Sequence, residues 1–86
     1  MPTHSFFQVQ VDASDSECWV VHFHNPHTTA ADYWLEVPAV VAAHPLDEAA
    51  ALVTRLFFKY APPAWREAGW VLVWNSVRAA LQRLQR

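Results

Sequence analysis

The chain has 86 residues, which is room for one α+β domain over 1–86 and not for two. Its single cysteine, Cys18, excludes an internal disulfide and fits a reducing compartment. Residues 1–54 hold seven acids and no lysine or arginine, whereas residues 55–86 hold six basic residues and one acid. Either the two halves neutralise each other in the fold or across a dimer, or they form separate acidic and basic faces.

No apolar run approaches the roughly 18–20 residues that a membrane-spanning helix needs. The N-terminal residues lack the basic start and long apolar stretch of a signal peptide. We therefore expect a cytoplasmic protein without membrane contact. The absence of isoleucine and the single lysine are typical of GC-rich coding sequence and favour a bacterial or phage origin.

Three strands are predicted in the first half of the chain. Residues 5–12, 18–24 and 33–37 alternate apolar and polar side chains, which is the period of a half-buried strand. Asp12 opens a turn rich in Asp and Ser, and Pro26 and Pro38 end the second and third strands. Short connections between consecutive strands favour a three-stranded antiparallel meander.

A helix over residues 46–60 is the clearest element, because apolar residues recur there at spacings of three and four. The predicted core stripe consists of Leu46, Ala49, Val53, Leu56 and Tyr60. A second helix is predicted over residues 76–85. Between them, residues 70–74 (WVLVW) fit either a short buried fourth strand or the start of that second helix. We favour the strand, because a helix apolar on all sides would need burial all round. In either case the helices pack on one face of the sheet.

The strand registers leave an unusual set of side chains on the face away from the helices. Two aromatic, one aliphatic and two histidine side chains stand where Lys, Glu and Thr are normal. Leaving the apolar ones in water forgoes roughly 1.5–3 kcal/mol each, so a partner or a second copy is expected to cover this face. Phe58 adds a further candidate contact on the helix 46–60, unless the C-terminal segment covers it. The candidate interface residues are Phe6, Val20, His22, His24, Trp34, Glu36 and Phe58.

The histidines also suggest a metal site as an alternative. His22 and His24 project to one side of a strand, His27 follows in a loop, and Glu36 on the next strand offers an oxygen. An H-x-H pair alone is a weak signal, and nothing else at metal-ligand spacing supports it; surface histidines that pair with Glu36 or with a partner carboxylate are the better explanation. We therefore predict no cofactor and no metal.

Catalytic constellations are missing from the sequence. Cys18 shares the sheet face with histidines, but a chain with one glycine, Gly69, offers no glycine-rich turn for an oxyanion hole or a phosphate cradle. We predict that the protein is not an enzyme.

Direct binding of nucleic acid is an alternative that would use the C-terminal helix through Arg78, Gln82, Arg83 and Arg86. The sequence pI near 6.2 argues against it, because nucleic-acid-binding domains are usually basic. The same arginines are explained by solvation and by the helix dipole.

The leading hypothesis is a small non-catalytic protein-interaction module. It would act as an inhibitor or adaptor of the phage or mobile-element type that docks on a larger protein, including one that handles nucleic acid, or self-associates as a homodimer through its sheet face.

Overall fold

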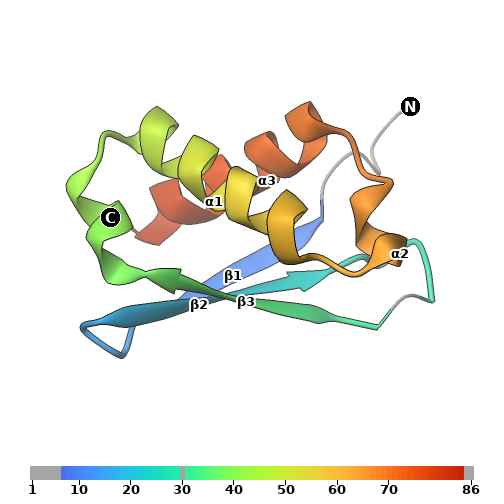
Figure 1. Ribbon diagram of the computed structural model, residues 1–86, viewed down its shortest axis with the longest axis horizontal. Helices are drawn as coiled ribbons and strands as arrows, with labels where there is room; N and C mark the ends of the chain where they lie inside the picture. Colours follow the sequence, from blue (N-terminus) through green and yellow to red (C-terminus); the bar gives the residue numbers. More distant parts are fainter. Residues whose placement is uncertain (1–6, 30, 85–86) are drawn as a thin grey trace.

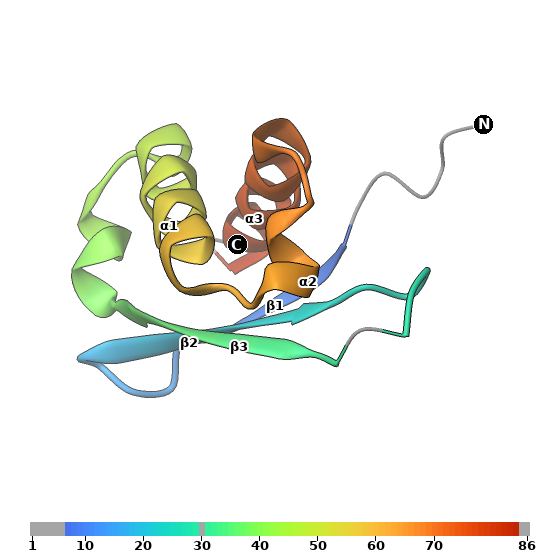
Figure 2. The ribbon, with the colours of Figure 1, turned by 45° about the vertical axis from the view of Figure 1, so that its right-hand side comes forward.

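The computed structural model describes residues 7–29 and 31–84. Its sheet has three antiparallel strands in the order β1-β2-β3. In chain order the elements are β1 (Gln8–Asp12), β2 (Cys18–His24), β3 (Tyr33–Pro38), the 3-10 helix η1 (Ala39–Ala43), α1 (Leu46–Tyr60), α2 (Pro63–Arg66) and α3 (Trp70–Leu84). Helices α1 and α3 lie side by side on one face of the sheet (Figure 1), and a turned view shows the other face uncovered (Figure 2). The predicted meander covered on one face by helices is confirmed.

Alternate side chains of the strands form the sheet's half of the core. Those buried against the helices are Val9, Val21, Phe23, Leu35 and Val37. The turn between β1 and β2 is closed by its own acids, because Asp12 Oδ1 accepts the N–H of Ser14 at 3.0 Å and Asp15 Oδ1 accepts the N–H of Glu17 at 2.8 Å. The period-2 pattern in the sequence correctly predicted both the strands and the side chains that face the helices.

Helix α1 has the predicted bounds, and its inward stripe packs on the sheet and on α3. Ala49, Val53 and Phe57 are buried. Tyr60 departs from the prediction, because its side chain is 58% exposed and Ala61, the next residue, takes the buried position. At the last residue of α1 the chain turns towards α2, so the helical period no longer decides which side chain faces in.

Residues 70–74 are helical, so the favoured fourth strand was wrong and α3 runs unbroken from Trp70 to Leu84. A helix here does not require burial of all five apolar side chains. The structure buries only Val73 fully and leaves Trp70 and Val71 44% and 67% exposed. Leu84 at the other end was expected to face in and is 38% exposed. The stripe of buried residues is thus narrower than the apolar run.

Three aromatic rings hold the layers together. The ring of Phe57 lies 4.9 Å from that of Phe23 and 6.2 Å from that of Trp65, between centroids. The indole Nε1–H of Trp65 donates to the carbonyl of Ala31 at 2.9 Å, which ties α2 to the loop before β3. Within the two described ranges, no helix combines the length and the apolar character needed to cross a membrane.

Candidate functional site: the open face of the sheet

The open sheet face consists of the strand side chains that point away from the helices. It carries Gln8, Gln10, Cys18, Val20, His22, His24, Trp34 and Glu36. Trp34 is 59% exposed, whereas Val20, His22 and His24 are half-buried. Phe6, a further predicted member, lies outside the described residues. The face therefore presents one large exposed aromatic side chain in a mostly polar setting.

The backbone pattern explains how Trp34 is held. The N–H of Ala39 donates to the carbonyl of Glu17 at 3.0 Å, one pair beyond the end of the β2–β3 register. The backbone hydrogen bonds between β2 and β3 therefore involve the odd-numbered residues of β3. His22 and Trp34 form a pair without such bonds, and in these pairs the two residues lie closer together. Their rings stack with centroids 4.6 Å apart and an interplanar angle of 10°.

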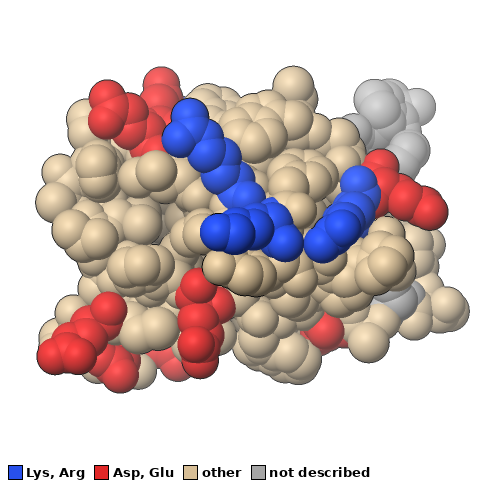
Figure 3. All heavy atoms as spheres, in the orientation of Figure 1, with Lys and Arg blue, Asp and Glu red and all other residues tan. Residues whose placement is uncertain are grey.

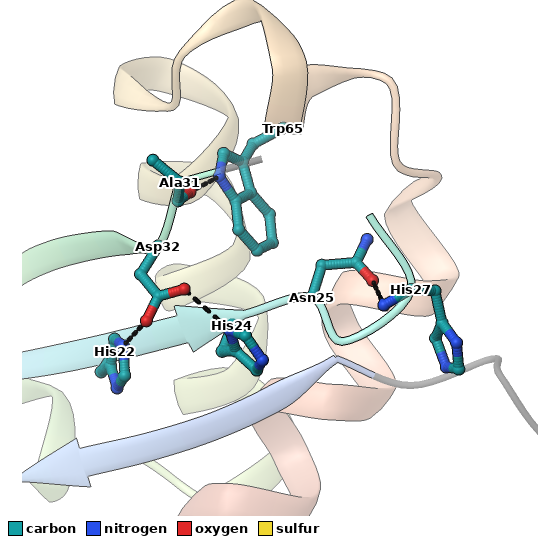
Figure 4. Close-up of polar contacts among 7 residues, drawn as sticks. All are labelled: His22, His24, Asn25, His27, Ala31, Asp32 and Trp65. Carbon is teal, nitrogen blue, oxygen red and sulfur yellow. Dashed lines mark hydrogen bonds and ion pairs between the residues drawn. The ribbon is translucent and has the colours of Figure 1, made fainter. Parts of the chain in front are cut away.

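Asp32 holds the two histidines in place. Its Oδ2 lies 2.8 Å from His22 Nε2 and its Oδ1 lies 2.7 Å from His24 Nδ1 (Figure 4). An ionised carboxylate only accepts, so both imidazoles donate through these nitrogens, and His22 Nδ1 and His24 Nε2 remain for other contacts. The hydrogen bonds from His24 and His22 hold the pKa of the Asp32 carboxyl below its ordinary value.

The position of Asp32 follows from the loop that carries it. Its neighbour Ala31 accepts the Nε1–H of Trp65, and the side chain of Asn25 accepts the N–H of His27 at 2.9 Å (Figure 4). Because Trp65 is buried in the core, the loop is anchored close to the carboxylate. The imidazole rings of His24 and His22, the Asp32 carboxylate and the Trp34 indole thus form a connected row across β2 and the start of β3.

Glu36 or a partner carboxylate was expected to pair with the histidines, and in the structure Asp32 pairs with them instead. Glu36 lies opposite Val20, away from His24. The register of β2 and β3, continued by one pair before Tyr33, places Asp32 opposite His24. The alternation that identified Trp34 as outward-facing therefore also pointed to Asp32, two residues earlier, but it was not extended into the loop.

The described residues do not assemble the metal alternative. Among residues 7–29 and 31–84, no group of three or more His, Cys, Asp or Glu is placed to hold a metal ion. Figure 4 shows His27 apart from His22 and His24, beyond Asn25. Cys18 and His22 are four residues apart on one strand, about 13 Å along it, so they do not form a Cys–His pair.

Phe58 was expected either to be covered by the C-terminal segment or to form a contact surface, and the structure covers it in part. Its half-buried ring packs edge-on to Phe57, with centroids 5.0 Å apart, and stacks on Trp70 at 6.0 Å and 16°. Trp70 is the first residue of α3, so the C-terminal helix does cover Phe58. Trp70 itself remains partly exposed.

Two of the arginines in the nucleic-acid alternative have contacts within the chain. Arg78 Nε donates to Asp47 Oδ1 at 2.5 Å, and its guanidinium lies 5.9 Å from the centre of the Trp74 ring. Arg83 donates to the carbonyl of Val9 at 2.9 Å. Gln82 is exposed, and Arg86 lies outside the described residues. These contacts give Arg78 and Arg83 a structural role that needs no nucleic acid.

Within the described ranges, the acidic first half and the basic second half of the chain meet at one ion pair, Arg78–Asp47. On the face shown in Figure 3, Lys and Arg gather in a band across the helical layer, with acids at its ends and below it. Part of the charge is thus paired in the fold, and part remains segregated. Comparison of the chain with protein-family models, with curated proteins and with solved structures finds no match.

Proposed function

We propose that the protein is a small non-catalytic interaction module that docks on a larger protein through its open sheet face and acts there as an inhibitor or adaptor. The observation that carries the proposal is Trp34, a large exposed aromatic side chain that is already held in one orientation. Trp is the residue type most enriched among those that dominate binding energy at protein interfaces.

Preorganisation strengthens this argument. The indole stacks on His22, and the His22 ring is in turn fixed by Asp32. A side chain that is ordered before binding loses less conformational entropy when a partner covers it. Burial of a Trp side chain contributes about 1.5–3 kcal/mol or more, so one well-placed indole is a large part of an interface.

The polar surroundings complete the expected pattern. Gln8, Gln10, Glu36 and the remaining nitrogens of the two histidines add hydrogen-bonding groups to the face that carries the indole. An apolar centre with a polar rim is the usual anatomy of a protein–protein interface. The face has no described Lys or Arg, which favours a protein partner over the phosphate backbone of nucleic acid.

The test compares tagged wild-type protein with Trp34→Asp, His22→Asp and a control, Val40→Asp, in capture from the source cell. Val40 is as exposed as Trp34 but lies on η1, off the open sheet face. We expect a protein that wild type and Val40→Asp retain and that Trp34→Asp loses. Capture of the same set by all four proteins would contradict the proposal, and a wild-type mass of two chains would assign the face to self-association.

A further inference from the structure

The two edges of the sheet differ in how their backbone groups are used. On β1 the outward groups are those of the odd-numbered residues, and α3 binds two of them: Ser76 Oγ accepts the N–H of Phe7 at 3.2 Å, and Arg83 donates to the carbonyl of Val9 at 2.9 Å. On β3 the outward groups are those of Trp34 and Glu36, since the odd-numbered residues face β2. Within residues 7–29 and 31–84, no hydrogen bond reaches these N–H and C=O groups.

The β3 edge also borders a hollow that could receive side chains. A depression of about 520 Å³ is lined by Val20, Tyr33, Trp34, Leu35, Glu36 and Tyr60. Tyr60 comes from the end of α1 and is largely exposed. Aromatic groups therefore stand on both sides of the edge, Trp34 on the open sheet face and Tyr60 on the side of the helices.

Positive charge lies above this edge. The ammonium of Lys59 is 5.3 Å from the centre of the Tyr60 ring, and Arg66 donates through Nε to the carbonyl of Ala61 at 2.8 Å and through its terminal nitrogen to that of Lys59 at 3.4 Å. In Figure 3, which has the orientation of Figure 1 with α1 and β3 in front, the band of Lys and Arg runs above the sheet. The side of the edge towards the helices is thus basic.

We propose that the open edge of β3 binds an extended segment of a partner protein as a fourth strand, with acidic side chains on the side of the helices and apolar ones beside Trp34. The inference rests on the proposed function in one respect, that the protein binds proteins, and it adds the backbone edge of β3, which adjoins the open sheet face at Trp34 and Glu36. Main-chain hydrogen bonds to Trp34 and Glu36 would supply affinity, and the alternating side chains would supply specificity.

A second copy of the chain fits this edge less well. In an antiparallel pairing of two β3 strands, the outward residues Trp34 and Glu36 must face outward residues of the other copy. One register places Glu36 opposite Glu36 of the second copy, and another places it opposite Asp32 of the second copy, so both oppose like charges.

A third register places Trp34 opposite Glu36 of the second copy, with the two-fold axis at Leu35. Tyr60 lines the same depression as Leu35, and the Lys59 ammonium lies beside the Tyr60 ring. An axis at Leu35 would therefore bring the Lys59 side chains of the two copies towards each other. An acidic partner segment would face Lys59 with opposite charge, whereas a second copy would face it with another lysine. Charge therefore favours a partner strand over a second copy.

The test uses full-length protein and a peptide of alternating valine and glutamate, blocked at both ends and long enough to cover β3. In an amide NMR titration we expect the backbone amides of Trp34 and Glu36 to shift, with little response to the matched valine–lysine peptide. Lys59→Glu should weaken binding about fivefold without affecting the fold, since Lys59 is exposed.

Glu36→Pro removes an outward N–H and no β2–β3 hydrogen bond, so we expect it to abolish binding, while Glu36→Thr keeps the N–H and binds. Gln10→Asp changes the open sheet face on β1, away from the β3 edge, so it should bind the peptide as wild type does, and the two proposals fail separately. Equal binding of both peptides, unchanged Trp34 and Glu36 amides, or concentration-dependent shifts of these amides without peptide would each overturn the inference.

Discussion

His22 and Trp34 face each other across β2 and β3 and stack almost in parallel, so the exposed indole of the open sheet face is ordered by the neighbouring strand. Loss of this contact is measurable without any partner. We expect Trp34→Ala to lower the free energy of unfolding by about 0.5–1.5 kcal/mol, the range for an aromatic pair. Urea denaturation checks this, with Val40→Ala as the control: Val40 is similarly exposed, and its loss should change little.

Acid should weaken the protein through Asp32. Its carboxyl has a lowered pKa in the folded state, so its contribution to stability is fully present above the ordinary carboxyl pKa near 4 and is lost as pH falls through the lower, folded value. We expect Asp32→Asn to flatten the acid limb of stability against pH. The limb should not vanish, because Asp12 also has a pKa lowered by its bonds with Ser14.

The Asp12→Asn/Asp32→Asn double variant should therefore be flatter than either single variant. Glu36→Gln, which removes a carboxylate without a hydrogen bond among the described residues, is the control. An acid limb of equal steepness in wild type and Asp32→Asn would contradict the role assigned to this carboxylate.

Two buried helix hydroxyls allow a matched comparison. Thr54 Oγ1 donates to the carbonyl of Ala50 at 2.7 Å, and Ser76 Oγ donates to that of Leu72 at 2.9 Å. Ser76 Oγ also accepts a hydrogen bond from the N–H of Phe7, and among the described contacts Thr54 Oγ1 accepts none. We expect Ser76→Ala to cost about 1 kcal/mol, while Thr54→Val stays within about 0.5 kcal/mol of wild type. Hydrogen exchange of the Phe7 amide should accelerate only in Ser76→Ala.

Trp65 should act on the histidines from a distance. Trp65→Phe keeps an aromatic ring in the core and removes the hydrogen bond to Ala31, next to Asp32. We expect a loss of about 2 kcal/mol in stability and a change in the ring NMR signals of His22 and His24. Trp19→Phe, also half-buried against the core, should leave those ring signals unchanged. Identical signals in both variants would show that the loop does not depend on the indole.

The sheet and α1 could be predicted because local period and inward face agree in both. Residues 33–37 alternate cleanly, and the α1 stripe matches the helical period up to Phe57, although not at Tyr60. The start of α3 could not be predicted, since a run of five apolar residues shows neither the period of a strand nor that of a helix. Its outcome depends on tertiary packing: α1 and the sheet offer room for the side chain of Val73, and those of Trp70 and Val71 stay in solvent.

The open sheet face was predicted from the same alternation, but its organisation was not. The stacking of His22 on Trp34 needs the register between β2 and β3, which the sequence of one strand does not contain. The choice of Asp32 over Glu36 depends on whether the extended conformation continues before Tyr33. That is decided by Trp65, which binds the loop from a distant part of the sequence.

Closure of one sheet edge limits how far copies of this protein could polymerise. Fibres grow when each added molecule exposes a fresh edge for the next. Here Ser76 and Arg83 bind the Phe7 N–H and the Val9 carbonyl of β1, so two molecules joined through β3 would offer a third molecule an edge with fewer open backbone groups. Substitutions that loosen the C-terminal part of α3 should therefore promote insoluble assembly more than their effect on stability alone would suggest.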